Sequence, residues 1–102
     1  MRASALTLEY VKVPTTVTIN GAPYDPHLDA VQLAFPAHGV APAGPDFKVG
    51  SWEQDQFGTW MARCLVGPGG AVSLVAGTYD VWVKITDSPE VPVRKVGILE
   101  VF

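Results

Sequence analysis

The feature that most constrains the fold is a regular alternation of apolar and polar side chains between residues 77 and 87. Successive side chains of a β-strand point to opposite faces, whereas a helix would distribute the same residues around its axis. One face of such a strand carries Tyr79, Val81, Val83 and Ile85, and the other carries Thr78, Asp80, Trp82, Lys84 and Thr86. The segment therefore predicts a strand with one face in the core and one face directed outward.

Alternation of the same kind recurs along the chain between turn-forming residues. The 102 residues include 10 glycines and 9 prolines, which separate short strands and argue against any long helix. Further strands are expected over residues 6–13, 15–20, 31–35, 48–53, 59–66, 72–74 and 93–102. Seven or eight short strands at this spacing predict an all-β fold, a single immunoglobulin-like β-sandwich of antiparallel strands that occupies residues 1–102 as one domain.

The first of these strands has an irregular pattern. Leu6, Leu8 and Tyr10 are apolar at one parity, whereas Val11 and Val13 are apolar at the other. This change predicts a bulge near Tyr10–Val11 or a strand that is buried on both faces. The expected core, taken from the inward parity of each segment, comprises Leu8, Val17, Ile19, Val31, Leu33, Trp60, Ala62, Cys64, Leu74, Tyr79, Val81, Val83 and Ile85.

Several residues predict local backbone features. Asn20-Gly21 is a hairpin turn signal, and Gly97 indicates a kink or bulge in the last strand. Tyr79 is expected to form a tyrosine corner, in which the phenol hydroxyl ties down a loop at the start of a strand. Residues 36–47, rich in proline and glycine, form the longest predicted irregular loop.

Charge and composition exclude several classes of function. Hydrophobic residues make up 48% of the chain and charged residues 17%, which predicts a buried core rather than disorder. The net charge of −3 argues against binding to nucleic acid or to an anionic membrane surface. The single cysteine, Cys64, excludes an internal disulfide. The first residues lack the long apolar run of a signal peptide, so we expect a protein that is made, at least at first, in a cytosol.

The residues needed for catalysis or metal binding are not found in a recognisable pattern. His27 and His38 are the two histidines, and Cys64 lies on the apolar face of a predicted strand, which favours a buried structural thiol. No zinc-ligand spacing occurs, and residues 67–70 (Gly-Pro-Gly-Gly) lack the lysine of a phosphate loop. The acidic residues near 25–29 and 87–90 favour turn capping over calcium binding. We therefore expect no catalytic residues, no metal and no cofactor.

The aromatic residues on outward positions suggest a surface that binds a partner. Trp82 lies opposite Tyr79 in parity, so it is either covered by another part of the chain or in contact with a partner. Trp52 presents the same two alternatives. Loop 36–47 and the segment 87–92 are further candidates for contact with a partner, with Trp82 and Trp52 as anchors. The predicted partner interface comprises Trp82, Trp52, His38, Val40, Phe47, Pro89 and Val91.

Four segments of the chain carry a resemblance to a known group of proteins. Residues 8–13, 62–70, 77–84 and 86–93 resemble small immunoglobulin-like structural proteins of tailed bacteriophages, particularly those that infect actinobacteria. The more specific parts are 63–70 (Arg-Cys-Leu-Val-Gly-Pro-Gly-Gly) and 87–92 (Asp-Ser-Pro-Glu-Val-Pro). The resemblance implies a non-enzymatic virion component, assembled in the host bacterial cytoplasm, whose partners are phage capsid or connector proteins and copies of itself in a symmetric assembly.

Two positions within a virion agree with this resemblance. A capsid decoration protein is favoured, because a compact sandwich suits that role, and a head–tail connector or tail component is the alternative. Outside virions, the alternative is a carbohydrate- or surface-binding module that uses Trp52 and Trp82. Glycan binding would require both rings to be exposed and coplanar, whereas a virion subunit needs loops and sheet edges that dock on protein.

Overall fold

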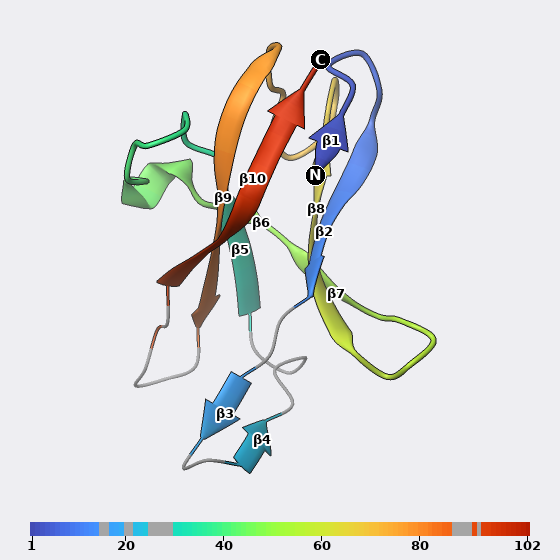
Figure 1. The fold of residues 1–102 in the computed structure, drawn as a ribbon, viewed down its shortest axis with the longest axis vertical. Helices are drawn as coiled ribbons and strands as arrows, with labels where there is room; N and C mark the ends of the chain where they lie inside the picture. The colour runs from blue at the N-terminus through green and yellow to red at the C-terminus, as the bar shows by residue number, and fades with distance from the viewer. Residues whose placement is uncertain (15–16, 20–21, 25–29, 87–90, 92) are drawn as a thin grey trace.

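Two β-sheets pack against each other, and a separate two-stranded pair lies at one end of the molecule (Figure 1). The computed structural model describes residues 1–14, 17–19, 22–24, 30–86, 91 and 93–102. The larger sheet contains, in spatial order, β1 (Arg2–Ala3), β10 (Val93–Val101), β9 (Gly77–Thr86), β5 (Ala30–Ala34) and β6 (Lys48–Val49). Strand β1 runs parallel to β10, and all other neighbours in this sheet are antiparallel.

The smaller sheet is fully antiparallel. Its strands, in spatial order, are β2 (Glu9–Pro14), β8 (Trp60–Val66) and β7 (Ser51–Gln54). The separate pair consists of β3 (Val17–Ile19) and β4 (Ala22–Tyr24), and a short 3₁₀ helix, η2, spans Gly44–Asp46. The described ranges contain no α-helix, and therefore no helix long and apolar enough to cross a membrane. The all-β prediction is confirmed.

The core fills the space between the inner faces of the two sheets. Leu33, Val81 and Leu99 from the larger sheet and Cys64 from the smaller one are its largest fully buried side chains. Burying a valine or leucine completely stabilises the fold by about 1.5–3 kcal/mol relative to leaving it exposed. Because both sheets contribute side chains to the core, the inner face of each sheet is covered by the other sheet. The other core residues include Val11, Val13, Val31, Ala62, Val66, Val83, Ile85 and Val101.

The segments with the clearest alternation form the predicted strands. Strands β5, β8 and β9 bury the apolar residues of the parity expected from residues 31–35, 59–66 and 77–87, and Ala34 and Asp80 are buried on the opposite parity as well. The register between β10 and β9 shifts between Lys95 and Gly97, which confirms the predicted irregularity at this glycine. The Tyr79 hydroxyl donates a hydrogen bond to the Val75 carbonyl oxygen at 2.8 Å, so the predicted loop-tying role of Tyr79 is confirmed. Trp60, Leu74 and Tyr79 are only partly buried.

The strand predicted over residues 6–13 exists as β2, but the prediction of its start and of its burial pattern was wrong. Leu6 and Leu8 are exposed and precede β2, which pairs with β8 in an uninterrupted register and buries Val11 and Val13. The strand therefore has neither a bulge nor two buried faces, and Leu8 is not a core residue. Tyr10 points to the outer face, where the Arg63 guanidinium carbon lies 4.3 Å from its ring centroid. This contact accounts for an apolar side chain on a surface position.

Three further expectations concern residues 72–74, the number of strands and the turn between β3 and β4. Residues 72–74 form no strand, and only a single bridge joins Val72 to Val66. The described residues contain ten strands instead of seven or eight, because several strands are only two or three residues long. Ile19 pairs with Ala22, which leaves the predicted turn residues 20–21 between β3 and β4 but outside the described residues. The predicted core positions 17 and 19 also have side chains outside the description.

Gly50 is the point at which the chain crosses from one sheet to the other. Strand β6 ends at Val49 in the larger sheet, and β7 begins at Ser51 in the smaller one. A Cβ atom at position 50 would lie 2.6 Å from Leu33 Cδ1 and 2.9 Å from the Arg63 carbonyl oxygen. Only glycine permits this close approach. The strand predicted over residues 48–53 is therefore two strands in different sheets.

Candidate functional site

Loop 36–47 begins by continuing along the edge of β9. The Asp80 N–H donates to the Pro36 carbonyl oxygen at 2.9 Å, and the His38 N–H donates to the Thr78 carbonyl oxygen at 3.1 Å. Ala37 and Tyr79 form an isolated antiparallel bridge in the register of β5. Because Pro36 lacks an N–H, the ladder weakens at this point, and the chain then leaves the sheet as a loop. Its first residues are thus held by backbone pairing.

The carboxylate of Asp80 fixes the loop on the outer face of the larger sheet. Asp80 is 2% exposed, and among the described residues it is the only polar or charged residue that is buried. Its Oδ1 lies 2.7 Å from His38 Nδ1 and 3.3 Å from Lys95 Nζ, and its Oδ2 accepts a hydrogen bond from the Gly39 N–H at 2.9 Å. Gly39 has φ +85°, a conformation that favours glycine. One carboxylate therefore joins the loop to β9 and β10.

The pKa of Asp80 follows from these contacts. The Gly39 N–H and then the His38 ring stabilise the ionised carboxylate, and Lys95 adds to their effect. Burial opposes ionisation but is outweighed, so the pKa is lowered from 3.8 to about 2. Asp80 is thus ionised at neutral pH, and it acts as an acceptor that organises its neighbours. This role does not require proton transfer.

Trp82 lies between two attachment points of the loop. On its face of β9 it is flanked by Asp80, which binds the start of the loop, and by Lys84, whose Nζ lies 5.4 Å from the ring centroid of Phe47 at the end of the loop. Ala34, the residue paired with Trp82 on β5, is fully buried. The side chain of Trp82 is partly buried, and its Nε1 is inaccessible to solvent without a hydrogen-bond partner among the described residues. Trp82 thus lies on the same face of β9 as the two side chains that hold the loop.

The predicted interface residues do not all lie together. His38, Val40, Phe47 and Trp82 are brought to the outer face of the larger sheet and its loop. Trp52 lies in the smaller sheet and packs against the core from β7. Val91 is exposed, and Pro89 falls outside the described residues. Their participation in an interface remains a prediction.

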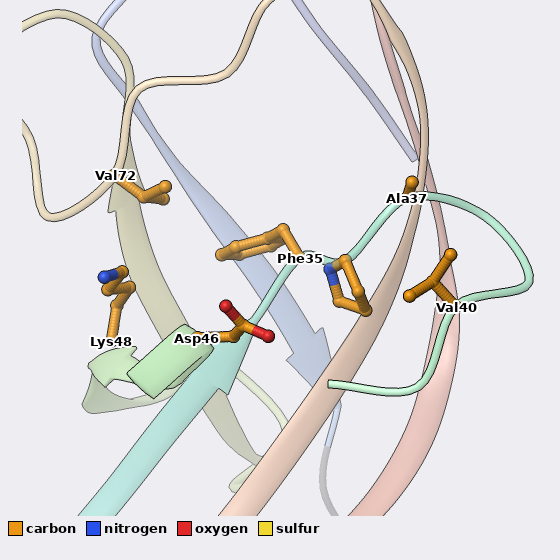
Figure 2. A pocket seen from close by; sticks show the side chains of 7 residues that line it. Phe35, Ala37, Val40, Asp46, Lys48 and Val72 are labelled. Carbon is orange, nitrogen blue, oxygen red and sulfur yellow. The ribbon is translucent and has the colours of Figure 1, made fainter. Parts of the chain in front are cut away.

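A small pocket opens beside the loop. It has a volume of about 320 Å³ and is lined mainly by Phe35, Ala37, Val40, Asp46, Lys48 and Val72 (Figure 2). Phe35 comes from the end of β5, and Val72 reaches the pocket from the segment that follows β8. The Asp46 carboxylate accepts a hydrogen bond from the Ala43 N–H at 2.7 Å, and Lys48 Nζ donates to the Pro45 carbonyl oxygen at 3.3 Å. The pocket walls combine apolar side chains with polar groups, and Asp46 and Lys48 contribute one charge of each sign.

The outer face of the smaller sheet is covered by polar contacts among its own side chains. Lys12 Nζ lies 2.7 Å from Glu53 Oε2, and Arg63 Nε donates to the Ser51 hydroxyl at 2.9 Å. The hydrogen bond from Lys12 is the main cause of a lowered pKa at Glu53. These ion pairs and hydrogen bonds link β2, β7 and β8 across the outer face of the smaller sheet.

Sequence reasoning missed the residues that organise the loop. Asp80 was assigned to the outward face as an ordinary polar residue, and Gly39 and Lys95 were not singled out. Asp80 and His38 are separated by 42 positions, and no periodicity connects them. One sequence signal could have pointed to Asp80 as a residue that holds a loop. It is an acidic residue on the same outward face of a strand as a tryptophan, as Asp80 and Trp82 are, in a chain with a long glycine-containing loop.

Neither a metal cluster nor a reactive thiol is formed by the residues that can be placed. Within the described ranges, no group of three histidine, cysteine or acidic side chains could hold a metal ion. Cys64 is buried, and burial raises the pKa of its thiol to about 11. Such a thiol is a poor nucleophile at neutral pH. The comparisons of this chain with protein-family models, with curated proteins and with solved structures find no match.

Proposed function

We propose that this chain is a non-enzymatic structural subunit of a tailed-phage virion, a capsid decoration protein that docks on its partners through loop 36–47 and the adjoining outer face of the larger sheet. The observation that carries the docking surface is the attachment of the loop by Asp80. A loop that is ordered before binding loses little conformational entropy on docking. Val40, which is 54% exposed, is presented on this fixed loop.

Strand order supports an immunoglobulin-like assignment. We assign the adjacent strands β10, β9 and β5 to the G, F and C positions of that fold, and β2, β8 and β7 to B, E and D, because the neighbours within each sheet agree with that order. Tyr79, near the start of β9, makes its hydroxyl contact four residues upstream, as a tyrosine corner does. The resemblance of residues 63–70 to phage structural proteins then supports the virion context.

The pinned loop favours decoration over the connector alternative. A connector subunit usually reaches its neighbours with an extended arm, and loop 36–47 was the segment available for that purpose. Backbone pairing at His38, the bonds to Asp80 and the contact of Phe47 with Lys84 hold this loop against its own sheet. It is therefore suited to surface docking and poorly suited to serve as an arm.

The positions of the two tryptophans disfavour the carbohydrate-binding alternative. Trp52 belongs to the smaller sheet and packs against the core, whereas Trp82 lies on the outer face of the larger sheet. Side chains placed in this way do not form one coplanar stacking platform. Protein docking needs no such platform, because it depends on shape and apolar contact around a few anchors.

The test is co-sedimentation with capsid shells assembled from the major capsid protein of the phage that encodes this chain. We expect the wild type to bind, and Trp82→Ala and a variant with a shortened 36–47 loop to lose binding while remaining folded. Val75→Asp serves as the matched control, because Val75 is exposed in a different loop. Wild-type occupancy of both variants would contradict the docking surface. Failure of the wild type to bind, together with a positive glycan array, would contradict the virion proposal.

A further inference from the structure

Strand β10 is longer than the strand that covers its edge. It spans Val93–Val101, whereas β1, its neighbour at the edge of the sheet, pairs only with its last two residues. The terminal amine of Met1 reaches slightly further and donates to the Ile98 carbonyl oxygen at 3.2 Å. The other end of β10 extends well beyond β1 (Figure 1). Among the described residues, no further strand lies beside this part of β10, so residues 93–98 form an open edge.

The hydrogen bonds of β9 show which backbone groups of β10 are already used. The Asp80 N–H and the Thr78 carbonyl oxygen bond to loop 36–47, on the side of β9 away from β10. The even-numbered residues of β9 therefore face the loop side, and the odd-numbered residues face β10. Val83 is one of the odd-numbered residues, and its partner in the register is Arg94. The backbone N–H and C=O groups of Arg94 are thus directed to β9.

The two neighbours of Arg94 direct their backbone groups the other way. Successive residues of a strand alternate, so the N–H and C=O groups of Val93 and Lys95 face the open edge. None of these four groups has a hydrogen-bond partner among the described residues. The register shift between Lys95 and Gly97 interrupts this line, which resumes at Ile98. Unpaired groups along a sheet edge are a template for an added strand.

The side chains along the open edge are apolar on one face and basic. Val93 and Ile98 lie on the outer face of the larger sheet and are 42% and 44% exposed. Arg94 has the opposite parity, is exposed and forms no ion pair with a described residue. Lys84, which is paired with Val93, and Lys95 add two more ammonium groups. Three of the 7 basic residues therefore lie at this end of the sheet, although the net charge of the chain is −3.

These charges decide which kind of strand the open edge accepts. A second copy would pair β10 with β10 about a two-fold axis. An antiparallel pair centred on residue 94 or 95 places the Arg94 or the Lys95 side chains of the two copies opposite each other, and like charges in that position destabilise a sheet. The bulge and the lysine therefore protect the edge against its own copy. A strand that carries carboxylates instead gains a favourable pair with Arg94.

We propose that the open edge of β10 binds an extended segment of a partner protein by strand addition, and that apolar and acidic side chains alternate in this segment. Its apolar side chains would lie beside Val93 and Ile98 on the outer face, and its carboxylates beside Arg94 on the opposite face. This site is additional to docking through loop 36–47 and does not depend on the virion role. Lys95 connects the two surfaces, because its Nζ lies 3.3 Å from the carboxylate of Asp80, which holds the loop.

The experiment measures the binding of synthetic peptides to the isotope-labelled protein by NMR spectroscopy. The probe is a capped peptide of alternating valine and glutamate, and the control peptide carries lysine in place of glutamate. We expect the glutamate peptide to bind with a Kd of about 0.1–1 mM, to shift the signals of residues 93–98 and to slow the amide exchange of Val93 and Lys95. The lysine peptide should bind about 10-fold more weakly.

Two substitutions of Val93 separate backbone pairing from side-chain contact. Val93→Pro removes an N–H that faces the open edge and leaves the bonds of Arg94 to β9, since proline is tolerated at the first residue of a strand. We expect it to fold, as checked by circular dichroism and thermal melting, and to bind the glutamate peptide about 5–10-fold more weakly. Val93→Thr loses apolar character but keeps the N–H, so it should bind more tightly than Val93→Pro.

A charge reversal tests the acidic character of the partner and does not depend on the proline variant. Arg94→Glu should prefer the lysine peptide over the glutamate peptide. Lys48→Glu is the matched control, because it makes the same change of charge in β6, at the opposite edge of the sheet, and should keep the wild-type preference.

Several outcomes would overturn the proposal. They are a wild type that shows no shifts at residues 93–98, equal binding of the two peptides, and unchanged binding by folded Val93→Pro. A wild-type dimer in sedimentation velocity that Val93→Pro abolishes would also overturn it, because the edge would then accept a second copy. Capsid co-sedimentation tests the docking proposal separately: a protein that binds the glutamate peptide but no capsid shells refutes only the virion role.

Discussion

The crossing of the chain between sheets makes Gly50→Ala the most informative stability variant. The added methyl group would lie 2.6 Å from Leu33 Cδ1, 2.9 Å from the Arg63 carbonyl oxygen and 3.3 Å from the Val31 carbonyl oxygen. Leu33 is fully buried and the other two atoms belong to paired strands, so none can move freely. Overpacking of this kind costs about 1–3 kcal/mol. For a chain of this size, each kcal/mol lowers Tm by about 4–8 °C.

The control is Gly44→Ala, because nothing lies within 4 Å of a Cβ atom at that position. Restricting the unfolded chain should stabilise this variant by about 0.4–1 kcal/mol. A second measurement combines Gly50→Ala with Leu33→Val, which removes the nearest clashing atom. We expect the double variant to be more stable than the sum of the two single effects predicts, by about 0.5 kcal/mol or more, in urea unfolding. Wild-type stability of Gly50→Ala, or strict additivity, would refute the argument that close packing demands glycine.

The remaining predictions concern three side chains. Cys64 should react with a thiol reagent only as fast as the protein unfolds locally, because the thiol is buried and its pKa is raised to about 11. Rapid stoichiometric labelling under native conditions would contradict its core position. The contribution of the ionised Asp80 to the free energy of unfolding should be complete above its ordinary pKa of 3.8 and disappear as the pH falls toward 2. Asp80→Asn should flatten the dependence of this free energy on pH in that range. An unchanged dependence would contradict the hydrogen-bonding account. Tyr79→Phe should lower the free energy of unfolding by about 0.5–1 kcal/mol in urea titrations, because it removes the bond to Val75; no change would mean that the corner is not stabilising.

The sequence was informative where a strand is long and has one buried face. Strand β9 and its inward residues Val81 and Val83 could be predicted from period-two alternation, because burial on one side imposes that period. Strand β1 could not, since two residues carry no period and their partner lies at the other end of the chain. The parity of β2 was misassigned because exposed Leu6 and Leu8 mimic a buried face. Composition cannot distinguish an apolar residue before a strand from one within it.

The candidate site was predictable only in outline. Loop 36–47 and Trp82 were each named as candidates for a binding surface, but neither their proximity nor the atoms that hold the loop could be predicted. A hydrogen bond between a loop N–H and a strand carboxylate leaves no trace in hydrophobic patterning, as the Gly39–Asp80 contact illustrates. Trp52 was misleading for a related reason. The segment around it is short and weakly patterned, so alternation could not show that Trp52 lies on the inner side of β7 and packs against the core.

The pairing of the first strand with the last affects how the protein can fold during synthesis. Strand β1 reaches its place only by pairing with Glu100 and Val101, and the Met1 carbonyl oxygen accepts a bond from the Glu100 N–H. The smaller sheet is available earlier, since its last strand ends at Val66. Its inner face is covered only once β9 and β10 have left the ribosome. A nascent chain therefore carries an uncovered apolar sheet from the synthesis of Val66 until Val101 has left the ribosome, the interval in which association with other chains or binding by chaperones competes with completion of the fold.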